Sequence, residues 1–388
     1  MKISSLWLCL LVVGLAPEVR LAAATESSVP ATAYALPTVD LSTDTGRQVV
    51  IAQGTDKIYQ GHPTTVLLPD GKTIYCVWTY GHGGQCGPLK RSDDGGRTWS
   101  ELLPVPDSWR TTRNCPAIYR LTDPAGVTRL VVYAGEGADG NIHRAQSTDD
   151  GKTWSEMTSI GLPGVMPFCT IAPVRGGQAL LGMSNIRRPG EKTEKRSNVV
   201  VQSLSTDGGL TWSPWEIVVD LPGLKPCEPG LVRSPDGKQL LCLIRENEKR
   251  VAFYMTSEDE GRSWTKPAPL PASLHGDRHV AKFLPDGRLV ICFRDTGNGS
   301  PTRNHFVAWI GTYADIVAGK TGQYRVKLLH SHKGGDCGYP GVEVLPDGTI
   351  VATTYIKYRP GPEKNSVVSV RFHPKETDAL ARAAEAKP

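Results

Sequence analysis

Short apolar runs, each interrupted by a turn such as Pro-Asp-Gly, recur along most of the chain. The stretch TTVLLPDGKTIYCVW, which begins at Thr64, places two β-rich segments on either side of an Asp-Gly turn. Asp-Gly between such segments is a strong hairpin signal. Related stretches are GLVRSPDGKQLLCLIR, HVAKFLPDGRLVICFR and GVEVLPDGTIVATTY, with weaker copies AIYRLTDPAGVTRLVVY and TIAPVRGGQALLGMS. The pattern predicts six antiparallel hairpins, and no long helix except one near Lys375–Ala386.

A second motif, S-x-D-x-G-x-[TS]-W, occurs four times, starting at Ser92, Ser147, Ser205 and Ser257. Its Asp can accept backbone N–H bonds within a tight turn, its Gly can adopt an unusual backbone angle, and its Trp can pack the turn onto a sheet. We therefore expect this Asp-box to be structural and not catalytic. Units that repeat about every 55 residues are typical of stacked or radial folds, and six of them account for most of the chain. We predict an all-β fold, a six-bladed β-propeller with Asp-box hairpins.

Composition agrees with a globular protein and excludes some partners. Hydrophobic residues make up 39% and charged residues 21%, and the 41 Gly and 30 Pro favour turns and short strands. The net charge of +5 comes from interspersed charges without a basic block. We therefore expect no nucleic-acid partner.

The N-terminus has the features of a secretory signal. A charged start at Lys2 is followed by an apolar run over residues 6–16 and by small residues up to Ala24. The run is too short to span a bilayer, and no later segment is long and apolar enough to do so. We expect a secreted or periplasmic protein without a lipid anchor. The predicted organisation is a signal peptide (1–24), an N-terminal extension (25–48), a propeller catalytic domain (49–373) and a C-terminal tail (374–388).

Eight of the nine cysteines remain once Cys9 is removed with the signal. Cys76, Cys242 and Cys292 lie within apolar runs, and we expect them to be buried thiols on strands. The other five lie near loops, where we expect some to form disulfides: Cys86, Cys115, Cys169, Cys227 and Cys337. No zinc spacing and no EF-hand loop occurs, so we expect no metal and no cofactor.

Asp-boxes on a six-bladed propeller resemble the sialidase (neuraminidase) superfamily, over about residues 49–371. In that family the fourth blade offers a Glu and then a hairpin that ends in an Arg, which Glu228 (in CEPG) and Arg245 (in LIR) match in type and order. A further family arginine precedes a later strand, and Arg303 in TRNHFV resembles it. The last blade of the family opens with the nucleophilic Tyr, and Tyr339 in GYPG has that place.

Two positions depart from the family. The Arg-Ile-Pro triplet of the first blade is Gly-His-Pro here, so His62 replaces an arginine. The loop over residues 78–87, where the family has its catalytic Asp, contains no carboxylate, and His82 is its only ordinary proton carrier. Arg113 and Arg278, which open the second and fifth blades, could replace the missing arginine. Alternative carboxylates near blade openings are Asp277, Asp295, Glu136 and Asp336.

The resemblance implies an exo-α-sialidase that releases terminal sialic acid from glycoconjugates. Guanidinium groups bind a carboxylate in bidentate fashion, so Arg245 and Arg303 would hold the sugar carboxylate. Tyr339 would attack the anomeric carbon, because a neutral phenol avoids the repulsion that a carboxylate nucleophile would meet. Glu228 would take the phenol proton and His82 would protonate the leaving oxygen. Further candidates for substrate binding are Arg278, Arg113 and His62. Without the usual Asp, an inverting mechanism is the alternative.

Two other functions remain open from the sequence. The lost arginine and the lost Asp favour a lectin, a propeller that binds acidic glycans without cleaving them. Tyr and His beside an arginine would also suit a polysaccharide lyase that acts on uronates. All three readings predict a partner of the same class, sialylated glycans or other acidic sugars, and we expect a monomer.

Overall fold

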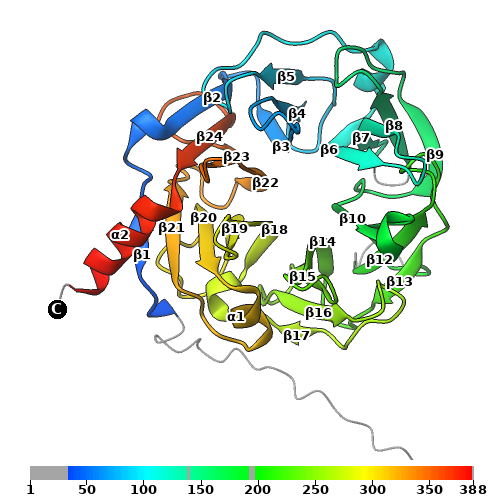
Figure 1. The fold of residues 1–388 in the computed structure, drawn as a ribbon. Coiled ribbons are helices and arrows are strands. Elements are labelled where there is room, and N and C mark those ends of the chain that lie inside the picture. The colour runs from blue at the N-terminus through cyan, green and yellow to red at the C-terminus, as the bar shows by residue number, and fades with distance from the viewer. Residues whose placement is uncertain (1–33, 138–139, 192–196, 387–388) are drawn as a thin grey trace, which may run out of the picture.

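The computed structural model describes residues 34–137, 140–191 and 197–386, and this part of the chain forms six β-sheets around one axis (Figure 1). The predicted all-β, six-bladed propeller is confirmed. The first blade is β3 (Gln60–Leu67), β4 (Ile74–Tyr80) and β5 (Leu89–Ser92). The second is β6 (Arg113–Thr122), β7 (Thr128–Gly135), β8 (Asn141–Ser147) and β9 (Thr158–Pro163). The third is β10 (Thr170–Val174), β11 (Ala179–Arg187), β12 (Asn198–Ser205) and β13 (Glu216–Val219).

The remaining blades also take up two strands from the start of the chain. The fourth blade is β14 (Pro226–Arg233), β15 (Leu240–Glu246), β16 (Phe253–Ser257) and β17 (Ala268–Pro269). The fifth is β18 (Gly276–Phe283), β19 (Leu289–Asp295), β20 (Phe306–Gly311) and β21 (Tyr324–Leu329), with β1 (Thr38–Asp40) parallel to β21. The sixth is β22 (Gly338–Val344), β23 (Ile350–Ile356) and β24 (Ser366–Phe372), with β2 (Gln48–Ala52) antiparallel to β24. The outermost strand of the sixth blade, β2, therefore comes from the opposite end of the propeller sequence.

Short helices join or cover the blades. The two α-helices of the described residues are α1 (Tyr313–Val317) and α2 (Pro374–Glu385), and the 3-10 turns are η2 (Thr45–Arg47), η3 (Asp107–Thr111), η4 (Arg175–Gly177) and η5 (Ala272–Leu274). The helix expected near Lys375–Ala386 is confirmed as α2. It lies on the outer side of the ring beside β1 (Figure 1), where Asp378 pairs with Arg288 of the fifth blade.

The core lies between neighbouring blades. Tyr75 and Val77 of β4 pack in one apolar cluster with Ile118 and Val132 of the second blade. Burial of such side chains stabilises a fold by about 25 cal/mol per Å² of apolar surface removed from water. Each blade is therefore held by its neighbours, and the six inner strands are fixed at one radius.

The four Asp-boxes have nearly the same geometry. In the first, Ser92 Oγ donates to Asp94 Oδ1 at 2.8 Å, and the Thr98 N–H donates to the same oxygen at 2.9 Å. In the other three boxes, the Asp Oδ1 accepts the corresponding backbone N–H at 2.9 Å (Asp149), 2.9 Å (Asp207) and 2.8 Å (Asp259). These hydrogen bonds close the turns within each motif and fit the expected structural role.

The cysteines follow the sequence expectations in part. Cys76, Cys242 and Cys292 are buried on strands, as predicted. The expectation that some loop cysteines pair is wrong: all eight cysteines of the described residues are free thiols. A physical reason is their placement, since Cys115, Cys227 and others open separate blades.

Within residues 34–386, apart from the two short gaps, no helix has the length and apolar character needed to cross a membrane. The predicted signal peptide lies outside the described residues, and the predicted domain limits stay a prediction.

Candidate active site

Five inner strands share a distortion near their first residues. Pairing with the next strand shifts register there, and the residue within the bulge has a positive φ. A bulge re-aims a side chain, and a positive φ is rare for residues other than glycine. We call this set the inner ring: His62 (49°), Cys115 (43°), Glu228 (50°), Arg278 (57°) and Tyr339 (53°). Cys115 Sγ lies 3.3 Å from His62 Nδ1, and this contact and those given below show that the five side chains converge at the axis.

Tyr339, Glu228 and Arg245 form a hydrogen-bonded series at the centre. The Tyr339 hydroxyl donates a short hydrogen bond to Glu228 Oε1, and Arg245 Nη1 donates to Glu228 Oε2 at 2.7 Å. The backbone N–H of Glu228 donates to Asn185 Oδ1 at 3.0 Å, which holds its strained backbone in place. Glu228 is only 5% exposed. This series matches the three residues that the resemblance implies for the nucleophile, its base and one arginine.

The electrostatics of the series keep Glu228 ionised and Tyr339 neutral. Burial raises the pKa of Glu228, but Arg245, Arg278 and the hydrogen bonds from Arg245 and Tyr339 outweigh it and lower the pKa to about 2. Burial and the nearby Glu228 carboxylate raise the pKa of Tyr339 well above its usual value. The proton therefore stays on the phenol oxygen, next to a carboxylate that can accept it.

Beside this series lies a small cavity of about 190 Å³, which we call the basic cavity. Its charged lining residues are four arginines and one aspartate: Arg245, Arg250, Arg294, Arg303 and Asp277. Asp277 Oδ1 lies 2.9 Å from Arg245 Nε, and Arg294 Nε donates to Asp277 Oδ2 at 2.9 Å. Among the described residues Arg303 is exposed and has no ion pair, so its guanidinium is available to an anion.

His82 lies on the rim of the site beside Asp336. The His82 side chain is 64% exposed, and its Nδ1 lies 3.6 Å from Asp336 Oδ1. The Tyr59 hydroxyl donates to the same carboxylate oxygen at 2.8 Å, and Lys333 Nζ lies 2.9 Å from Oδ2. Burial raises the pKa of Asp336, but the interactions with His82, Lys333 and Tyr59 outweigh it and lower the pKa. Asp336 is therefore an ionised partner of His82.

Aromatic rings connect this rim to the nucleophile candidate. The His62 ring lies 4.4 Å from the Tyr339 ring and 4.6 Å from the His82 ring, measured between centroids. Burial, followed by the effect of His82, lowers the pKa of His62 to about 3. His62 is thus a neutral imidazole in the position where the family resemblance predicts an arginine.

The other predicted residues are placed differently. Arg278 lies below Tyr339, with its Cζ 5.3 Å from the centre of the ring, and it lines a different cavity from the basic one. Arg113 is exposed at the start of β6, outside the lining of the basic cavity. Of the alternative carboxylates, Asp277 and Asp336 are in the site, while Asp295 is buried against Arg325.

Three residues were not among the sequence candidates. Arg250, Arg294 and Tyr59 all contact a site carboxylate. Arg294 ends the hairpin LVICFR in the same way that Arg245 ends LLCLIR, so a comparison of the repeats could have found it. Nothing in the sequence marks Tyr59.

Comparisons with known proteins agree on the fold. A family model described as a BNR repeat-like domain matches residues 41–222 and 173–351. A protein of unknown function from Dyadobacter fermentans superposes with a TM-score of 0.66 at 17% identity, covering 84% of this chain and 97% of that one. The NanB sialidase of Streptococcus pneumoniae gives 0.56 at 12% identity, covering 85% and 71%.

An intramolecular trans-sialidase from Ruminococcus gnavus, solved in complex with oseltamivir carboxylate, gives a TM-score of 0.56 at 14% identity, covering 84% of this chain and 97% of that one. A search of curated proteins finds no match. At these identities the structural likeness establishes the fold alone. The family match covers most of the chain, and so the protein belongs to the BNR repeat-like family and has the six-bladed propeller fold that sialidases share.

Proposed function

We propose that the protein is a glycoside hydrolase that removes a terminal acidic sugar, of the sialic acid type, from glycoconjugates. The observation that carries the proposal is the buried series Tyr339–Glu228–Arg245, in which a neutral phenol donates to an ionised carboxylate. A binding protein has no need of such a pair at the axis. The sialidase neighbours, one of them solved with a carboxylate ligand, support the substrate class.

The basic cavity is suited to the carboxylate of such a sugar. Its lining carries four arginines against one aspartate, and Arg303 has no competing ion pair among the described residues. A guanidinium binds a carboxylate through two parallel hydrogen bonds. With the carboxylate held there, the anomeric carbon that bears it would lie beside Arg245 and its partner Glu228, and so near the Tyr339 hydroxyl.

In the proposed reaction, Tyr339 Oη forms a bond to the anomeric carbon while the bond to the leaving oxygen breaks. Glu228 accepts the phenol proton, and His82 donates a proton to the leaving oxygen. Because the pKa of Tyr339 is raised and that of Glu228 is lowered, this proton moves only as the new C–O bond forms. Water then cleaves the tyrosyl intermediate, with Glu228 returning its proton to Tyr339 and His82 taking a proton from the water.

One observation favours a second candidate, a uronate lyase. His62 is a neutral imidazole whose ring lies 4.4 Å from the Tyr339 ring, and a His and a Tyr side by side could act as base and acid in a β-elimination. The hydrogen bond from Tyr339 to Glu228 favours the hydrolase, since elimination does not need it.

Sugar release tests the proposal. The protein is incubated with a sialylated glycoprotein and a fluorogenic aryl sialoside, alongside Tyr339→Phe and Glu228→Gln. We expect each variant to lose about 10²–10⁴-fold in kcat, the usual contribution of a proton-transfer or nucleophilic group. Tyr313→Phe and Glu258→Gln make the same chemical changes away from the axis and serve as matched controls.

Other outcomes have distinct meanings. Sugar release that survives both axial variants contradicts the assignment of Tyr339 and Glu228. No release from any sialoside, together with ultraviolet absorbance from uronate polymers, indicates the lyase. Retention on a glycan array without any cleavage indicates a lectin.

A further inference from the structure

A second cavity runs along the propeller axis behind the candidate active site. It has a volume of about 410 Å³ and is lined by the inner strands of all six blades of the described chain. We call it the axial cavity. Arg278, a member of the inner ring, lines one end of this cavity, while half-exposed Lys282 and its partner Glu343 lie further along β18 and β22, toward the opposite face. The cavity is therefore separate from the basic cavity, and only the inner ring lies between it and the proposed site.

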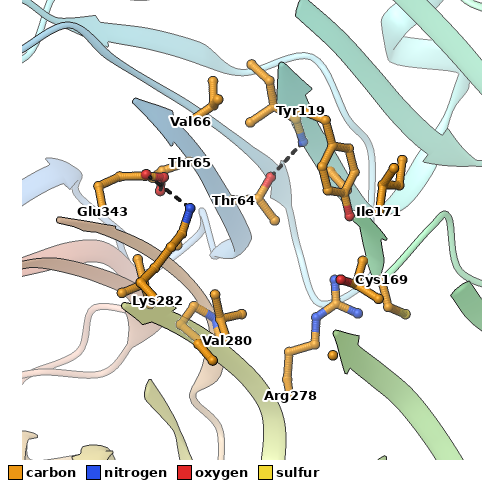
Figure 2. Close-up of a pocket in the computed structure, with 18 of the residues that line it drawn as sticks. Thr64, Thr65, Val66, Tyr119, Cys169, Ile171, Arg278, Val280, Lys282 and Glu343 are labelled. Carbon is orange, nitrogen blue, oxygen red and sulfur yellow. Dashed lines mark hydrogen bonds and ion pairs between the residues drawn. The ribbon is translucent and has the colours of Figure 1, made fainter. Parts of the chain in front are cut away.

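Arg278 enters this cavity without a counter-ion of its own. Its side chain is 4% exposed, and its Nη1 has no hydrogen-bond partner among the described residues. Figure 2 shows the guanidinium beside Cys169 and below Tyr119, on a different part of the wall from the Lys282–Glu343 pair. The Tyr119 hydroxyl already donates its proton to the carbonyl oxygen of Phe168 at 2.8 Å.

None of the neighbouring groups neutralises the guanidinium. Burial raises the pKa of the Cys169 thiol and that of Cys115, so both remain uncharged. The Glu228 carboxylate acts on Arg278 electrostatically, but it already accepts hydrogen bonds from Arg245 and Tyr339. A buried charge is costly unless it is paired and hydrogen-bonded. The geometry thus leaves a cation with a free N–H donor facing an internal cavity.

We propose that the axial cavity binds a small monatomic anion, a halide, against Arg278 Nη1. A halide has no directional lone pairs and can be held by the positive charge of Arg278 and the free N–H donor at its Nη1. A carboxylate or phosphate would bring two or more oxygen atoms that each need a donor, whereas Arg278 Nη1 is the buried N–H of this lining that lacks a partner among the described residues. The site would be occupied from the face opposite to the one that receives the sugar.

Occupancy of this site would act on the proposed reaction, a consequence that rests on the proposed function. Arg278 lies against the Tyr339 ring, and its charge also helps to hold the pKa of Glu228 low. A bound anion would offset part of that charge and make Glu228 a better proton acceptor. Sugar release at fixed ionic strength should therefore rise with chloride and saturate.

Bromide tests the binding site directly and does not depend on activity. Crystals of the whole protein grown in bromide are measured at the bromine absorption edge, where an anomalous peak is expected at hydrogen-bond distance from Arg278 Nη1. In solution, the excess line width of the ⁸¹Br resonance should be largely lost in Arg278→Gln and retained in Arg262→Gln. Arg262 is exposed on an Asp-box turn, so this control removes the same charge far from the axis.

The two measurements overturn the proposal in different ways. Water without an anomalous peak beside Arg278, or peaks only at surface arginines and lysines, shows that no anion site exists. An equal loss of line width in Arg278→Gln and Arg262→Gln shows that bromide responds only to net charge. The crystal measurement needs no variant, so a failure of Arg278→Gln to fold leaves the test intact. Bromide binding without any sialoside cleavage would contradict the proposed hydrolase and leave the anion site standing.

Discussion

Backbone strain and buried charge coincide at single residues of the inner ring. Each positive φ at a residue other than glycine costs on the order of 1–3 kcal/mol, and such residues persist where the surroundings determine them. At Glu228 the surroundings are identifiable, since Asn185 accepts its N–H and Arg245 and Tyr339 bind its carboxylate. Four of the five ring residues precede a proline, and this X-Pro signal at the start of four hairpins is readable in the sequence.

His82 is the proposed proton donor, and substrates with different leaving groups test this role. For His82→Gln we expect a loss of about 10²–10⁴-fold in kcat on natural glycosides, because an alkoxide leaves poorly without protonation. An aryl sialoside with an acidic phenol leaving group should lose far less. Asp336→Asn should also lose more kcat on natural glycosides than on the aryl sialoside, but by a smaller factor, because Asp336 is a positioning residue that acts through His82.

A purely structural role of His82 or Asp336 predicts equal losses on both substrates, and that result would contradict the assignment. His143→Gln on β8 is the matched control, since it removes a histidine from another strand of the propeller. The sequence cannot select Asp336 from its four alternative carboxylates. The contact between residues 82 and 336 forms only when the first and last blades meet.

At the scale of the elements, each Asp-box concentrates its hydrogen bonds on one carboxylate. Asp94 accepts from the N–H groups of Arg97 and Thr98 and from the hydroxyls of Ser92 and Thr98. The adjacent Asp93 instead binds Arg91 on the surface. The two neighbours differ in environment although they are the same residue type, and so form a matched pair.

We expect Asp94→Ala to destabilise the protein by about 1–2 kcal/mol, because several donors of the turn lose one charged acceptor at once. Asp93→Ala should change stability by less than about 1 kcal/mol, as is usual for an exposed ion pair. Urea unfolding at pH 7 measures both, and equal effects would contradict the structural role of the motif.

Partial burial raises the pKa of Asp94, but its hydrogen bonds lower it to about 2. Its contribution should therefore be complete above about pH 4 and be lost as the pH falls through 2.

The repeats explain which elements the sequence predicts and which it does not. Hairpins such as β3–β4 and β14–β15 carry their own turn signals, so their existence follows from local patterns. The places of β1 and β2 in the sheets do not follow from local patterns. β1 pairs with β21 and β2 pairs with β24, and these partners lie nearly 300 residues or more later in the chain. No local propensity encodes a contact of that separation. The absence of disulfides is likewise a property of the ring, which distributes the loop cysteines over separate blades.

On the scale of the whole molecule, closure of the ring buries imidazoles along with the charged groups. His62 and His279 are 3% and 2% exposed, and their positions on β3 and β18 belong to the inner surface of the propeller. Burial is the main cause that lowers the pKa of His62 to about 3 and that of His279 to about 4. Both remain neutral in the folded protein at pH values where an unfolded histidine takes up a proton.

This difference predicts that stability decreases as the pH falls below about 6.5. Between pH 6.5 and 4 the unfolded chain binds more protons than the folded one, so the free energy of unfolding rises with pH. Each such imidazole contributes up to about 1.4 kcal/mol per pH unit. Urea unfolding at pH 5, 6 and 7 should show this slope, whereas between pH 7 and 8 histidine contributes none because it is neutral in both states. His279→Gln should reduce the difference in bound protons between the unfolded and the folded state by about one, and so reduce the slope, whatever its effect on stability at pH 7. A slope that is unchanged in this variant would show that His279 is not a source of the pH dependence.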